Sequence, residues 1–76
     1  MAKKPPTLSV TYEVQQDANG RWNVLRDGAP TGAFARDKST AIGQAYAAAT
    51  RETAESNLKV TVYSVQNGKR TKEWPK

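Results

Sequence analysis

The sequence predicts an α+β fold: a small antiparallel sheet with one helix packed on one face. Three observations lead to this class. Apolar and polar residues alternate near both ends of the chain, two Asn-Gly pairs mark tight turns, and one long stretch (residues 36–52) has helical periodicity. With 76 residues the chain has room for one core. We place a single domain at residues 7–74, between a flexible basic arm at 1–6 and a tail at 75–76.

The first two strands form the first predicted hairpin. Every second residue from Leu8 is apolar, which puts two sets on opposite faces: Leu8, Val10, Tyr12, Val14 and Ser9, Thr11, Glu13, Gln15. Asn19-Gly20 tolerates the positive φ of a tight turn. The return strand, residues 21–26, places Trp22 and Val24 on one face and Asn23 and Leu25 on the other, and we expect Trp22 to anchor the core.

The third strand and the helix follow. Residues 27–32 have the composition of two successive turns, so residues 33–35 form a short third strand or an extended connection. We expect Phe34 to fill the sheet beneath the helix. Asp37 suits the N-cap, so the helix begins at about Lys38. Its apolar stripe is mostly small and lets the helix lie close to the sheet: Ala41, Ile42, Ala45, Ala48, Ala49.

The last two strands form the second predicted hairpin. Asn57 is a suitable left-handed stop for the helix. Alternation then resumes, with two expected faces: Leu58, Val60, Val62 toward the core, and Thr61, Tyr63, Val65 away from it. Asn67-Gly68 supplies the hairpin turn, and residues 70–74 form a charged edge strand that ends at Pro75.

Two runs of this sequence resemble a known family. They are "YEVQQDANGRWNVLRDGAPTGAFARDKSTAIGQAYAAA" and "VTVYSVQNGKR", and the family is the small bacterial group called domain of unknown function 2188. The resemblance covers about residues 10 to 72 and implies the same strand and helix order, but no reaction and no site residues. The chain departs from the family pattern at Asp37, where Thr is usual, at Thr40, where Glu is usual, and at Arg21, which separates Gly20 from Trp22.

A second likeness concerns the junction of sheet and helix. Phe34 followed by "DKSTAIGQAYAAA" looks like the three-stranded DNA-binding domains of tyrosine integrases and plant ethylene-response factors. In those domains the sheet enters the major groove and the helix packs behind it, so the likeness implies DNA binding through strands. A convergent amphipathic helix behind a sheet has the same pattern.

The composition excludes most enzyme mechanisms. The chain has no Cys and no His, which removes disulfides, thiolate nucleophiles, imidazole bases and the usual zinc ligands. The carboxylates have turn, cap or helix-end positions, and no glycine run forms a phosphate loop. We therefore expect no catalytic residues, no metal and no cofactor. The first ten residues lack the apolar run of a secretory signal or membrane span, so we expect a cytoplasmic protein. The family resemblance implies a bacterial or phage origin.

The charge directs attention to the strands. Lys and Arg outnumber Asp and Glu by 12 to 7, for a net charge of +5. Our first hypothesis is a non-enzymatic nucleic-acid-binding protein that uses the sheet face away from the helix and the last hairpin. The candidate residues for binding nucleic acid or a partner are Arg21, Leu25, Arg26, Lys59, Tyr63, Val65, Lys69, Arg70 and Lys72.

A second hypothesis is a protein-binding module. Leu25, Tyr63 and Val65 together with a free sheet edge suit strand addition, as in a phage or mobile-element inhibitor of a bacterial protein. The same face also suits a homodimeric accessory protein. The lysines of the last strand alternatively serve only to protect a solvated edge from aggregation.

Overall fold

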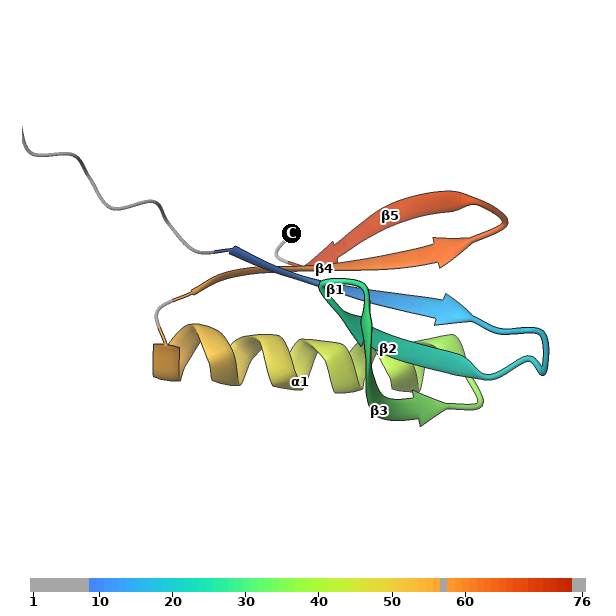
Figure 1. Ribbon diagram of the computed structural model, residues 1–76, viewed down its shortest axis with the longest axis horizontal. Helices are drawn as coiled ribbons and strands as arrows, with labels where there is room; N and C mark the ends of the chain where they lie inside the picture. Colours follow the sequence, from blue (N-terminus) through green and yellow to red (C-terminus); the bar gives the residue numbers. More distant parts are fainter. Residues whose placement is uncertain (1–8, 57, 75–76) are drawn as a thin grey trace, which may run out of the picture.

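The computed structural model describes residues 9–56 and 58–74. The expected arm at 1–6, the inward position of Leu8, the helix stop at Asn57 and the tail at 75–76 lie outside these residues. The elements run in the order β1 (Ser9–Gln16), β2 (Trp22–Arg26), β3 (Ala29–Ala35), α1 (Lys38–Ser56), β4 (Lys59–Gln66) and β5 (Lys69–Trp74). The α+β class and the element order are confirmed. Figure 1 shows α1 lying along one side of the strands.

The sheet is mixed, which corrects the expectation of an antiparallel one. Its spatial order is β3-β2-β1-β4-β5, and the central pair, β1 and β4, is parallel. The direction of each element explains this. The two antiparallel pairings of β2 make β3 parallel to β1. Because α1 returns the chain to the end where β3 began, β4 starts in the direction of β3 and lies parallel to β1.

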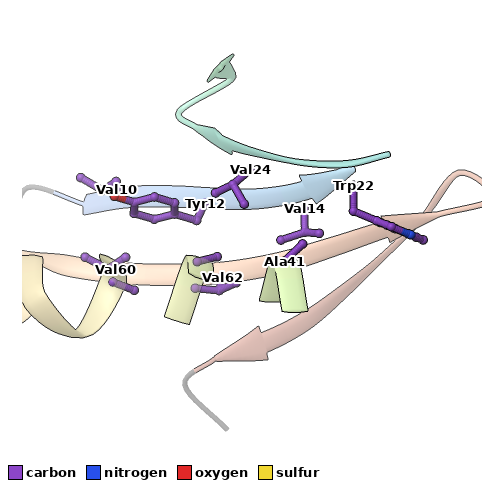
Figure 2. Close-up of a cluster of buried hydrophobic side chains, with 10 residues drawn as sticks. Val10, Tyr12, Val14, Trp22, Val24, Ala41, Val60 and Val62 are labelled. Atoms are coloured by element: carbon purple, nitrogen blue, oxygen red, sulfur yellow. The ribbon is translucent and has the colours of Figure 1, made fainter. Parts of the chain in front are cut away.

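The core lies between α1 and the helix side of the three central strands. Its side chains are Val10, Tyr12, Val14, Trp22, Val24, Ala41, Ala45, Ala49, Val60 and Val62. Figure 2 shows Val14 of β1 pointing towards Ala41 of α1. The three alanines are fully buried and four residues apart, so their small side chains bring the helix backbone close to the valines. Trp22 is only 6% exposed, which confirms it as a core residue.

The start of the helix is also confirmed. Thr40 donates its backbone N–H to Asp37 Oδ2 at 2.9 Å, and α1 begins at Lys38. This bond satisfies one of the free N–H groups of the first turn, and hydrogen bonds from Thr40 hold the pKa of Asp37 below its ordinary value.

Two hairpins close with the same turn, but one is not where the sequence predicts it. Asn67-Gly68, between β4 and β5, has φ values of 53° and 76°, as predicted. The other such turn is Asp27-Gly28, between β2 and β3, with 51° and 85°. Between β1 and β2, Gly20 has a positive φ and Asn19 does not, so a wider loop replaces the expected Asn-Gly turn.

The third strand is longer than predicted because a bulge absorbs the second expected turn. Asn23 pairs with Phe34 and Leu25 with Pro30, so three residues of β3 lie opposite one residue of β2. Gly32 has a φ of 89°, and Thr31 Oγ1 donates a 2.8 Å bond to the carbonyl of Val24. A hydroxyl thus satisfies a backbone group that regular pairing would have used.

Candidate functional site

The candidate site is the face of the sheet opposite α1, which we call the open face. Strand register places two rows of side chains across it: Leu25, Glu13, Tyr63, Lys72 and Asn23, Gln15, Val65, Arg70. Of the nine residues proposed from the sequence, five meet in these rows. They are Leu25, Tyr63, Val65, Arg70 and Lys72.

Arg70 lies on top of an aromatic ring on this face. Its Cζ atom is 3.8 Å from the centre of the Tyr63 ring, and its Nε atom is 3.2 Å from Glu13 Oε2. The side chain is still 51% exposed. In the described part of the chain, no hydrogen bond occupies its terminal NH₂ groups. Arg70 is thus oriented from below while both terminal NH₂ groups remain available to a ligand.

A polar column on β1 divides the open face. Thr11, Glu13 and Gln15 point to this side, and Gln15 Nε2 donates to Glu13 Oε1 at 2.8 Å. Leu25 on β2 and Tyr63 on β4 flank Glu13, and two strand spacings separate them by roughly 10 Å. The apolar residues of this face therefore form two separate groups instead of one patch.

A groove of about 460 Å³ opens on the β2–β3 half of this face. Apolar and polar side chains share its lining: Val24, Leu25, Pro30, Ala33, Phe34 and Gln15, Gln16, Asp17, Arg21, Asn23. Phe34 is 50% exposed, so the expectation that it lies beneath the helix is wrong. The pairing explains why: its neighbour Ala35 is opposite buried Trp22, and consecutive strand residues face opposite sides.

Arg21 is held beside this groove by the β1–β2 loop. Its Cζ atom lies 4.7 Å from the centre of the Phe34 ring, and its Nε atom is 3.6 Å from Asp17 Oδ2. The Asp17 carboxylate also accepts from Asn23 Nδ2 at 2.9 Å and from the backbone N–H groups of Asn19 and Arg21. The bond from Asn23 is the main reason that the pKa of Asp17 is lowered.

Arg26 does not contribute to the open face. It lies opposite Tyr12 on the helix side, where its Nη2 atom is 2.7 Å from Glu52 Oε1 of α1. Tyr12 donates its hydroxyl to the same carboxylate. These bonds, first that from Arg26, lower the pKa of Glu52, whereas burial is the main cause of the raised pKa of Tyr12. The sequence pattern did not reveal this connection between helix and sheet.

Two candidate lysines, Lys59 and Lys69, lie at strand ends, away from Arg70 and Lys72. Lys69 is opposite Gln66, whose side chain accepts a bond from Lys38 Nζ at 3.0 Å, so Lys69 lies on the helix side of β5. Lys59 faces the open side by alternation with Thr61, but at the far end of the sheet, opposite Ser9. Neither side chain lies beside those of Arg70 and Lys72 on the open face.

A bulge in β5 also moves Trp74 to the helix side. Tyr63 pairs with Lys72, but Val62 pairs with Trp74, so Glu73 is the extra residue. Trp74 then meets the ring of Tyr46 on α1 edge-on, with centroids 5.7 Å apart. Glu73 accepts a hydrogen bond from the buried hydroxyl of Ser64. The aromatic side chain that the sequence places near the basic hairpin thus helps attach β5 to the helix.

Four residues of the site were missed as candidates from the sequence. Gln15, Asn23, Phe34 and Arg36 line the groove or the shallower depression beside it, where Arg36 joins Arg21 and Phe34. Alternation correctly assigns Gln15 and Asn23 to the face away from the core. Their direct pairing could not be inferred, because it depends on the register of β1 on β2, which the wider loop sets in place of the expected Asn-Gly turn.

The acidic side chains of the described residues do not assemble into a site. Across residues 9–56 and 58–74, no three of them cluster in a way that would hold a metal ion. Within the same residues, α1 lacks the combination of length and apolar character that crossing a membrane requires.

Comparison of the chain with protein-family models, with curated proteins and with solved structures found no match. The resemblance to domain of unknown function 2188 stays a prediction. The function is therefore argued from the open face itself.

Proposed function

We propose that this protein binds nucleic acid through the open face of its sheet. One observation carries the proposal: guanidinium groups and aromatic rings are paired twice on this face. Arg70 lies over Tyr63, and Arg21 lies over Phe34. Phosphates attract guanidinium groups and bases stack on rings, so these pairs place both kinds of contact at adjacent points of one surface.

The charge of the face supports the same class of ligand. Five cations lie on it or at its ends: Arg21, Arg36, Lys59, Arg70 and Lys72. Three carboxylates accompany them: Glu13, Asp17 and, at one end, Asp27, which accepts a hydrogen bond from the backbone N–H of Thr11 at 2.9 Å. Glu13 and Asp17 are each engaged by an arginine and by the amide of a neighbouring side chain. Their role in the face is to orient the arginines, which leaves the excess positive charge directed at solvent.

The geometry is less favourable to a protein partner added at a sheet edge. β3 carries Pro30 and a bulge, and β5 carries a bulge and three basic residues. These features disturb the regular row of backbone groups that an added strand needs. The polar column of β1 similarly interrupts the apolar surface that a homodimer would bury. A protein partner or a second copy is therefore the outcome to test against.

The test is a titration of labelled DNA with the purified chain over a range of salt concentrations. If three to five phosphates are contacted, affinity for a single strand falls roughly 20- to 130-fold between 50 and 200 mM salt. Fluorescence anisotropy with single-stranded and duplex probes measures this slope. Sedimentation of the free protein shows whether a second copy occupies the face.

A matched pair of variants identifies the surface. Lys72→Gln and Lys69→Gln remove the same charge from the same strand, on the open face and on the helix side respectively. We expect Lys72→Gln to weaken binding and to reduce the salt slope by about 0.7, because one phosphate contact is lost. Lys69→Gln should have nearly the same affinity and salt slope as the parent protein.

Two results would contradict the proposal. The first is an absence of binding to single-stranded and duplex probes at low salt. The second is binding that both lysine variants weaken equally, because a non-specific attraction to net charge has that property.

A further inference from the structure

We infer that the ligand is a single strand, and that the groove beside Phe34 takes one unstacked base with an exocyclic amino group. This rests on the proposed function and specifies its substrate class. The base would stack on the face of the Phe34 ring that Arg21 does not cover, and its amino group would donate to the side-chain carbonyls of Gln15 and Asn23. Adenine, cytosine and guanine have such a group, whereas thymine and uracil lack it.

The groove has the form of a site for a flat organic group. Its volume of about 460 Å³ lies in the range of small-ligand pockets, roughly 300–1,000 Å³. Leu25, Pro30 and Ala33 line it together with Phe34. Half of the Phe34 side chain is exposed to water on a sheet face. A base stacked on the ring would bury this apolar surface.

Phe34 is held in place from the backbone. Its strand pairs with β2, and its carbonyl accepts a bond from Gln44 Nε2 of α1 at 3.2 Å. Arg21 is positioned close to the ring by the loop carboxylate of Asp17. The stacking surface and its adjacent cation are thus arranged before any ligand arrives, which lowers the ordering cost of binding.

The amide side chains have a defined orientation. Gln15 directs its NH₂ group to Glu13, and Asn23 directs its NH₂ group to Asp17. A carboxylate only accepts hydrogen bonds, so the amide nitrogens must face it. Neither amide oxygen has a partner among the described residues. The groove therefore offers two acceptors, and a base amino group is the donor that suits them.

This chemistry requires a single strand. In a duplex both faces of a base are stacked and its pairing edge is occupied. A base that stacks on Phe34 while its amino group reaches the amide oxygens has to leave the stack. Nearby, Arg21 and Arg36 would neutralise the adjoining phosphates.

The experiment compares oligo(dC) with oligo(dU) of about 12 nucleotides, at neutral pH and constant salt. These probes share backbone, length and ring size. They differ at C4, where cytosine has an amino group and uracil an oxygen, and at N3. We expect oligo(dC) to bind at least about 5-fold more tightly, the lower range for one base-specific hydrogen-bond arrangement. A duplex of mixed sequence should bind more weakly than oligo(dC).

Two kinds of variant separate stacking from recognition. Phe34→Ala should lose about 5- to 150-fold in affinity for oligo(dC), the effect of one stacked base. Tyr46→Leu removes an exposed ring on the helix but keeps an apolar side chain against Trp74, so it should change the affinity for oligo(dC) little. Gln15→Met keeps the side-chain volume but removes the acceptor, so it should reduce the preference for oligo(dC) over oligo(dU). Circular dichroism of each variant confirms that it is folded.

The outcomes distinguish this inference from the proposed function. Salt-dependent binding with no effect of Phe34→Ala, or with equal affinity for the two oligonucleotides, overturns the base site and leaves the nucleic-acid surface in place. Equal binding of duplex and single strand overturns it as well. Absence of binding to every probe overturns both.

Discussion

The clearest test of the fold compares alanine substitutions at two aromatic residues, one in the core and one on the surface. The sequence assigns both Trp22 and Phe34 to the core, but the structure leaves 6% of Trp22 and 50% of Phe34 exposed. Replacing each by alanine should therefore have very different consequences. For Trp22→Ala we expect the free energy of unfolding to fall by about 3–5 kcal/mol, through lost burial and the cavity left next to α1.

The size of that loss can be compared with the total. A 76-residue chain has a stability of about 4–11 kcal/mol at typical values per residue. Trp22→Ala should thus lower Tm by more than about 12 °C or abolish folding. Phe34→Ala removes a ring that is half buried and in contact with Arg21, so it should lower the free energy of unfolding by only about 1 kcal/mol.

Thermal and urea unfolding followed by far-ultraviolet circular dichroism measure both variants with one signal. Trp22→Phe is the control, because it retains a ring on the helix side and should recover much of the loss. The reasoning is refuted if Phe34→Ala destabilises as much as Trp22→Ala. That result would place Phe34 in the core and remove the ring from the proposed base site.

Two further predictions concern the helix and the turns. Glu52→Gln should lower stability by about 1 kcal/mol at neutral pH, because it weakens the bonds from Arg26 and Tyr12. The pKa of Glu52 is lowered in the folded protein, so its contribution to the free energy of unfolding is complete above the unfolded-state pKa and is lost as pH falls. The stabilities of parent and variant should therefore converge in acid. A difference in stability that does not change with pH would contradict this. Gly43→Ala should stabilise by about 0.5–1 kcal/mol, since it lies inside α1 and, apart from its own helix backbone, no atom is within 4 Å of the new Cβ. Gly68→Ala, at a φ of 76°, should destabilise. Changes in Tm of the same sign for the two variants would refute this assignment.

Local rules predicted the elements and most of the buried residues correctly. Strand alternation depends only on the two-residue period, so it places Val10, Val14 and Val62 in the core without knowledge of the partners of each strand. The cap at Asp37 depends on neighbours within one helical turn. These features are encoded over a few residues and could be read from the chain.

The sequence-based predictions were wrong where a bulge adds residues to one strand of a pair. The β3 bulge extends a strand through residues whose composition indicates a turn, and the β5 bulge sends Trp74 to the side opposite Lys72. A one-residue shift reverses the face of every side chain that follows it. Arg26 and Lys69 are on the helix side for a different reason: they alternate regularly with Leu25 and Arg70, and their charge alone made them candidates.

The sequence by itself determined the α+β class, the order of the elements, the small apolar stripe of the helix and the excess of positive charge. Only the tertiary structure decided the register of β1 on β2, which brings Gln15 beside Asn23, and the pairing of β1 with β4, which brings Glu13 beside Tyr63 and Arg70. The physical reason is range. Periodicity and turn chemistry act between residues a few positions apart, whereas the open face is assembled from strands that are distant in the chain and meet only when the sheet forms.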